Sequence, residues 1–131
     1  MSKASTRNRA TGTAARRRRL QALKVSAAFR DFVLDQLADV PKLRSKAMFG
    51  AVGLYSGEHF FGILAGDVLY LKADDTTRAA FVKAGGLPFT PYPGQAASMS
   101  YYSVPIGVLE SPPDLIPWVK RSIAIARTPR N

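Results

Sequence analysis

The sequence contains no cysteine and only one histidine in 131 residues. The absence of cysteine excludes disulfide bridges, thiolate nucleophiles and cysteine-based zinc sites, and it suits a reducing cytoplasm. A single histidine excludes histidine-based metal sites, which leaves the carboxylates able to hold only a hard cation. We therefore expect a protein without a bound metal or cofactor.

Long hydrophobic runs are also missing, since the longest falls far below the length of about 20 residues that a membrane-spanning helix needs. Hydrophobic residues make up 47% of the chain and charged residues 21%, which is typical of a globular protein. A chain of 131 residues is long enough for one domain with a substantial core. We expect one soluble, cytoplasmic domain with no membrane contact.

Acidic residues are absent from the first 24 positions, which hold eight basic residues and so carry a formal charge of +8. The rest of the chain holds the other 11 bases and all nine acids, a formal charge of +2. The basic leader, residues 1–24, has few apolar side chains to bury, so we expect it to be disordered and dispensable for folding. We expect the domain to span residues 25–127, followed by a short tail at 128–131.

Four consecutive arginines in the leader form a candidate nucleic-acid site: Arg16, Arg17, Arg18 and Arg19. Such a run neutralises phosphates and binds DNA or RNA without sequence preference and with a steep salt dependence. Two other interpretations stay open, because an acid-free leader is also typical of an organellar transit peptide or of an extension from a misassigned start codon. Since the rest of the chain is nearly neutral, we expect any binding to double-stranded DNA to reside in the leader.

The stretch from Lys46 to Lys72 consists of three apolar segments separated by Ser56-Gly57 and Gly66-Asp67. The segments are rich in aromatic and branched residues and too short for buried helices, whereas the breaks have the composition of tight turns. This pattern predicts a meander of antiparallel strands. Apolar residues on both faces of the last two strands indicate that helices cover one of these faces.

Two amphipathic segments predict helices on either side of the meander. The first begins at an N-cap, Ser26, and ends before Pro41. The second follows Asp74-Asp75, which we interpret as helix caps, and stops at Gly85-Gly86. A third helix is predicted at the end of the domain.

The third predicted helix ends at Arg127. Either it starts at Asp114, so that Pro117 falls in the first turn, where its missing N–H matters least, or it starts earlier and kinks at Pro117; we favour the start at Asp114. Three prolines before it predict an extended loop: Pro88, Pro91 and Pro93. The segment Ser98–Val104, ended by Pro105, predicts an edge strand beside the meander, with its two tyrosines on opposite faces.

Together these elements predict an α+β fold, an antiparallel sheet built on the strand meander with helices packed mainly on one face. We expect the core to contain most of the large apolar side chains of the sheet and helices: Phe29, Phe32, Phe49, Phe61, Leu69, Leu71, Phe81 and Trp118.

Lys42, Arg44 and Lys46 alternate with smaller residues, so on a first, edge strand these three cations share one face. Such a stripe is suited to docking an acidic partner or a phosphate backbone. The alternative is that the charges only protect an exposed edge from pairing with another chain.

Catalytic chemistry has little support in the sequence. His59 lies at a turn beside Glu58, and no serine has the surroundings of a nucleophile elbow, so a solvated histidine is favoured over a catalytic one. Four aromatic residues could form a surface on which nucleic-acid bases stack, although such residues in a covered sheet more often belong to the core. They are Phe89, Tyr92, Tyr101 and Tyr102.

The region from about Val25 to Ala126 resembles the N-terminal domain of the TfoX/Sxy family, regulators of natural competence in bacteria. The resemblance rests on short motifs that include Met48, Phe49, Gly50, Gly53, Tyr55, Tyr70, Lys72, Tyr101 and Pro105, together with Trp118 in the last helix. It implies an α+β fold and a cytoplasmic role in gene regulation, where family members assist the cyclic AMP receptor protein. Since these residues are mostly apolar or glycine, we interpret them as structural. The family's helical C-terminal domain has no counterpart in this sequence.

Two classes of function remain. The first is a non-enzymatic regulatory module that acts in competence-type transcription regulation by contacting another protein, or nucleic acid through its basic leader. The alternative is a small-molecule-binding domain or an enzyme that uses an apolar pocket between the sheet and the helices.

Overall fold

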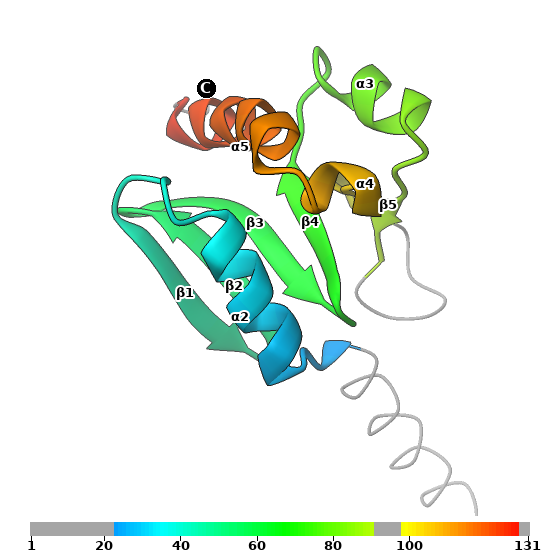
Figure 1. Ribbon diagram of the computed structural model, residues 1–131. Coiled ribbons are helices and arrows are strands. Elements are labelled where there is room, and N and C mark those ends of the chain that lie inside the picture. The colour runs from blue at the N-terminus through cyan, green and yellow to red at the C-terminus, as the bar shows by residue number, and fades with distance from the viewer. Residues whose placement is uncertain (1–22, 91–97, 129–131) are drawn as a thin grey trace, which may run out of the picture.

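The computed structural model describes residues 23–90 and 98–128, which form an antiparallel sheet with helices (Figure 1). The sheet has six strands in the order β1-β2-β3-β4-β6-β5. The strands are β1 (Leu43–Met48), β2 (Ala51–Ser56), β3 (His59–Ala65), β4 (Val68–Lys72), β5 (Pro88–Phe89) and β6 (Ser98–Ser103). The helices within the described ranges are α2 (Ala27–Gln36), α3 (Arg78–Lys83), α4 (Ile106–Leu109) and α5 (Pro112–Arg127). The predicted α+β fold is confirmed.

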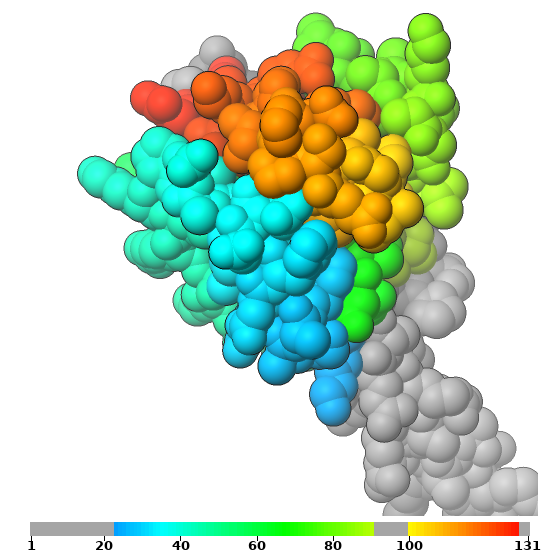
Figure 2. Space-filling model, in the orientation of Figure 1, coloured from blue at the N-terminus to red at the C-terminus, as the bar shows by residue number. Residues whose placement is uncertain are grey.

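The two longest helices, α2 and α5, cover the same face of the sheet (Figure 1). Val33 from α2, its C-cap residue Leu37, and Leu115 and Val119 from α5 belong to one core cluster with the sheet, and all four are fully buried. Seen from this side, the side chains of both helices close over the strands (Figure 2). Ser122 of α5 is also buried, and its hydroxyl donates a 2.8 Å hydrogen bond to the carbonyl oxygen of a β4 residue. No helix in the described ranges has the length and apolarity needed to span a bilayer.

The meander is confirmed, because β1 to β4 pair consecutively in antiparallel register. Its turns use positive φ angles at Gly57 (62°), Gly66 (56°) and Asp67 (56°), as the two predicted turn sequences require. A further turn joins β1 to β2 through Phe49 and Gly50, with φ angles of 52° and 90°.

Most of the predicted core is confirmed, but two of its members are wrong. Phe49 is 81% exposed, because it occupies the β1–β2 turn and does not lie on a strand face. Phe32 is 39% exposed, because Val33 and Leu37 turn the adjacent face of α2 toward the sheet. The predicted core residues Phe61, Leu69, Leu71 and Phe81 are buried, and Phe29 and Trp118 are partly buried against them.

The prediction that Ser98–Val104 is an edge strand is wrong. In the sheet, β6 lies between β4 and the two-residue strand β5, in which Pro88 pairs with Tyr102. The prolines of the predicted loop therefore did not exclude a ladder at Pro88, since an outermost strand tolerates a residue without an N–H. Pro91, Tyr92 and Pro93 lie outside the described residues.

The predicted start of the last helix is also wrong, because α5 begins at Pro112, two residues before Asp114. Pro112 and Pro113 fit the first two helical positions, where backbone N–H groups have no partner inside the helix. Pro117 consequently lies inside α5 and not in its first turn. The predicted end at Arg127 is confirmed.

The N-terminal end of the described chain is packed against the meander. Leu23 is buried, and its carbonyl oxygen accepts a 3.2 Å hydrogen bond from the N–H of Gly66. The predicted N-cap is confirmed, since Ser26 Oγ accepts a 3.1 Å hydrogen bond from the N–H of Phe29. The described chain is therefore packed against the sheet from its first residue, Leu23, and residues 1–22 lie outside the described part.

Two phenylalanine substitutions test this core. Phe61→Ala should lower the free energy of unfolding by about 3–5 kcal/mol, because it removes a fully buried ring. Phe49→Ala should change it by less than about 0.5 kcal/mol, because that ring is exposed. Urea denaturation of both variants measures the difference, and equal losses would show that the two rings have similar surroundings.

Candidate functional site

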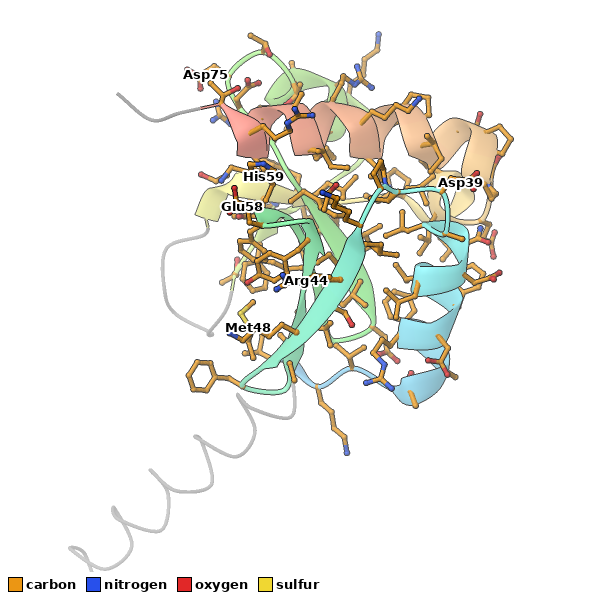
Figure 3. All side chains as sticks on the ribbon, turned by 90° about the vertical axis from the view of Figure 1, so that its left-hand side faces the viewer. Asp39, Arg44, Met48, Glu58, His59 and Asp75 are labelled. Carbon is orange, nitrogen blue, oxygen red and sulfur yellow. The ribbon has the colours of Figure 1, made fainter. Side chains whose placement is uncertain are left out.

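The face of the sheet opposite α2 and α5 carries a continuous set of aromatic and basic side chains, which we call the open face. Strand register places Arg44 opposite Tyr55, Lys46 opposite Gly53, and Lys72 opposite Tyr101. Figure 3 shows Arg44 and Met48 on the side of the sheet away from α2. The open face comprises Arg44, Lys46, Met48, Gly53, Tyr55, Phe60, Ile63, Tyr70, Lys72, Phe89 and Tyr101.

Five aromatic rings contact one another on the open face. The ring of Phe60 lies between Tyr55 and Tyr101, with centroid distances of 5.1 and 5.7 Å. A second pair, Tyr70 and Phe89, has a centroid distance of 4.9 Å. All five side chains are partly exposed. Partial burial of this ring cluster raises the pKa of Tyr70 above its ordinary value.

Gly53 allows these side chains to lie directly on the sheet. A Cβ atom at this position would be 2.7 Å from Met48 Cε, 3.0 Å from Phe60 Cε1 and 3.3 Å from Tyr55 Cε1. These distances are too short for an undisturbed contact, so any larger residue must displace the neighbouring side chains. Gly53 therefore sets the positions of three members of the open face.

Two cations of the open face lie over aromatic rings. The guanidinium carbon of Arg44 is 5.5 Å from the centroid of Tyr55, and Lys72 Nζ is 5.6 Å from that of Tyr101. Both distances are within the range of cation–π attraction. The predicted edge position of the first strand is confirmed, since β1 pairs only with β2.

Lys42, the third cation of the predicted stripe, lies at the end of the sheet, where it lines a groove together with Arg44. It precedes β1, has a φ of 50°, and accepts a 2.9 Å hydrogen bond from the N–H of Gly57 through its carbonyl oxygen. The structure therefore brings Arg44 and Lys46 together on the open face and places Lys42 at the end of the sheet.

A shallow groove of about 550 Å³ lies at this end, and none of its lining residues is buried. The lining residues are Pro41, Lys42, Arg44, Ser56, Gly57, Glu58, His59 and Arg127. His59 and Glu58 are neighbours here (Figure 3). Since the groove is open to solvent, it offers no enclosed site for catalysis through His59. Within the described ranges, no three histidine, aspartate or glutamate side chains gather closely enough to hold a metal ion.

The acidic pair before α3 has a structural role, but the predicted Asp N-cap is wrong, because Thr77 is the N-cap residue of α3 and Asp74 stabilises the turn before it. Asp74 Oδ1 accepts hydrogen bonds from the N–H groups of Thr76 and Thr77, both at 3.0 Å, and from the Thr76 hydroxyl at 2.7 Å. These bonds, the Thr76 hydroxyl first, hold the pKa of Asp74 below its ordinary value. Asp75 instead pairs with Arg78 at 2.7 Å.

Other candidate residues lie elsewhere. Tyr102 is buried on the helix-covered face and stacks on Phe81, so it does not contribute to the open face. The predicted opposite orientation of Tyr101 and Tyr102 is confirmed. Arg16 to Arg19 lie outside the described residues. The space between sheet and helices, where a ligand pocket was the alternative, is filled by fully buried side chains such as Leu54, Phe61 and Leu115.

Six of the nine motif residues converge on the open face: Met48, Gly53, Tyr55, Tyr70, Lys72 and Tyr101. Phe49 and Gly50 form the turn at one end of this face, and Pro105 begins α4. Sequence reasoning interpreted these residues as structural and missed Phe60 as a member. The two-residue period alone would have missed it, because an irregularity in the register between Leu54 and Tyr55 places Phe60, and not Phe61, on the same face as Ile63.

Residues 35–126 match the sequence model of the TfoX N-terminal domain family. The matched region extends from the end of α2 to α5 and therefore includes every strand of the sheet. No curated protein sequence matches the chain.

A glycine pair tests the packing of the open face. Gly53→Ala should lower the free energy of unfolding by about 1–3 kcal/mol, because its methyl group overpacks against Met48, Phe60 and Tyr55. The matched control is Gly107→Ala in α4, where an added Cβ meets nothing within 4 Å. That control should be neutral or stabilising, because alanine favours helix. Urea denaturation with near-UV circular dichroism distinguishes the two, and an unchanged aromatic spectrum in Gly53→Ala would contradict the assigned role.

Proposed function

Because the chain belongs to the TfoX N-terminal domain family, we propose that it is a non-enzymatic regulatory module that acts in the cytoplasm on competence-type transcription. We further propose that it acts by binding a macromolecule through the open face. The partner belongs to one of two classes, another protein or a nucleic acid.

One observation carries this proposal. Residues scattered from position 48 to position 101 in the sequence come together on the face of the sheet opposite α2 and α5. The helix-covered face supplies the main core, whereas the rings of the open face pack on a small buried cluster and stay partly exposed. Partly exposed aromatic residues and arginine are also the side chains that most often dominate binding energy at interfaces.

The chemistry of the open face favours binding over catalysis. Its polar side chains are mostly cations and tyrosines, and Glu58, which lines the neighbouring groove together with Arg44, is exposed to solvent. The one histidine lies at the groove beyond the face, in contact with solvent. The surface is therefore suited to recognition.

An open-face variant tests the proposal in the source organism. We define this variant as Arg44→Gln, Lys46→Gln and Tyr55→Leu, which removes two cations and one ring. Deleting the gene should change the transcript levels of competence-type genes, the wild-type chain should restore them, and the open-face variant should not. RNA sequencing measures the outcome, and immunoblotting verifies equal protein levels.

A matched helix variant controls for loss of charge. Arg30→Gln with Lys120→Gln removes two exposed cations from α2 and α5, and it should restore transcription as the wild type does. Full restoration by the open-face variant would contradict the assignment of this surface. An unchanged transcriptome after gene deletion would contradict the regulatory role itself.

A further inference from the structure

We propose that the open face is a binding surface for single-stranded nucleic acid, with bases stacked on its rings and phosphates held by its cations. This inference rests on the proposed function of the open face and names its partner. DNA and RNA share the chemistry concerned, and the experiment below distinguishes them.

Charge is separated between the sheet and the rest of the domain. None of the residues in the six strands is Asp or Glu, whereas Arg44, Lys46 and Lys72 all lie on the open face. The acids lie in helices, turns and connections: Asp31, Asp35, Asp39, Glu58, Asp67, Asp74, Asp75, Glu110 and Asp114. A polyanion that follows the open face thus meets cations from three positions without opposing carboxylates on the strands.

The aromatic rings of the open face provide a surface on which the bases of a flexible single strand can stack. Tyr55, Phe60 and Tyr101 form a row across the sheet, and each is partly exposed. Stacking on such rings requires no particular base, because every base has a π face. Arg44 and Lys72 lie over the outer two rings of this row. A base that stacks on one of these rings displaces the cation, which then lies beside the adjoining phosphate.

The same features argue against two other polyanions. A DNA duplex keeps its bases stacked inside the helix and would use only the cations, of which the open face has three. An acidic peptide would also pair with the cations but has no planar groups to cover the row of rings. Single-stranded nucleic acid uses both features, and it is therefore the occupant that the observations favour.

The basic leader joins the domain at this surface. Leu23, where the described chain begins, packs in the same cluster as Ile63, Phe60 and Tyr101 of the open face. The described chain therefore starts beside the open face.

Fluorescence anisotropy of labelled polymers tests the inference on the full chain. The probes are oligothymidylate, oligouridylate of the same length, a mixed-sequence DNA duplex and a polyglutamate peptide. All measurements use a parent variant in which Arg16, Arg17, Arg18 and Arg19 are changed to Ala, so that binding by the leader does not mask the domain.

We expect the parent variant to bind a single-stranded probe more tightly than the duplex or the peptide. Adding Tyr55→Leu should weaken this binding by about 5- to 150-fold, the range for loss of one stacked base. With three cations at phosphates, the logarithm of affinity should fall with the logarithm of salt concentration with a slope of about −2. Adding Lys46→Gln, an exposed charge whose loss does not endanger folding, should reduce the steepness of this slope by about 0.7.

The matched control adds Arg30→Gln and Lys120→Gln to the parent, which removes two exposed charges from α2 and α5. It should leave single-strand affinity within about twofold of the parent, because neither residue lies near the proposed path. Urea denaturation of each variant verifies that it is folded. Preference for oligothymidylate over oligouridylate, or the reverse, identifies the nucleic acid without affecting the inference.

Three results would overturn the inference. They are equal binding of Tyr55→Leu and its parent, equal loss in the helix control, and tighter binding of polyglutamate than of either single strand. If one of them occurs while the open-face variant still fails to restore transcription, the proposed function stands and its partner is a protein. If single strands bind as expected but transcription is independent of the open face, the proposed function fails instead.

Discussion

The structure depends on a sheet that is apolar on both faces, one of which is covered by α2 and α5. On the covered face, Leu54, Phe61 and Leu71 are fully buried beneath α2 and α5, and this burial supplies the main driving force for folding. On the opposite face, the strands must reduce their contact with water through their own side chains. Aromatic rings that pack sideways against one another, together with Leu23, do this on the face opposite α2 and α5.

This solution makes the open face rigid as well as partly exposed. Gly53 lets Met48, Phe60 and Tyr55 lie close to the backbone, and the cation of Arg44 lies over the ring of Tyr55. Side chains that are fixed before a partner arrives lose little conformational entropy on binding. The residues that keep water from the sheet are thus also suited to recognition. The same motif can therefore have both a structural and a functional role.

The sequence predicted the helices, strands and turns better than it predicted which of them lie next to one another. The turns at Gly57 and at Gly66-Asp67 were recognisable because their residues tolerate positive φ angles. The turn at Phe49 was not, because phenylalanine rarely adopts such an angle and a run of apolar residues conceals the reversal. β6 was expected at an edge because the prolines before it interrupt a ladder, although two residue pairs, at Pro88 and Phe89, are enough to cover it.

The open face lay beyond prediction for a related reason. The two-residue period assigns Arg44 and Tyr55 each to a face of its own strand, but only the register shows that the two residues are opposite one another.

The net charge of the domain was misleading for a similar reason. The sequence outside the leader has a formal charge of +2, and this total conceals that basic and acidic residues lie in different parts of the domain. The strands carry basic residues and no acid, while carboxylates cap or flank helices and turns, where backbone N–H groups stabilise them, as at Asp74. Acidic residues are thus favoured at helix ends and turns over positions in the strands. A surface with a positive potential follows, without any excess of charge in the domain as a whole.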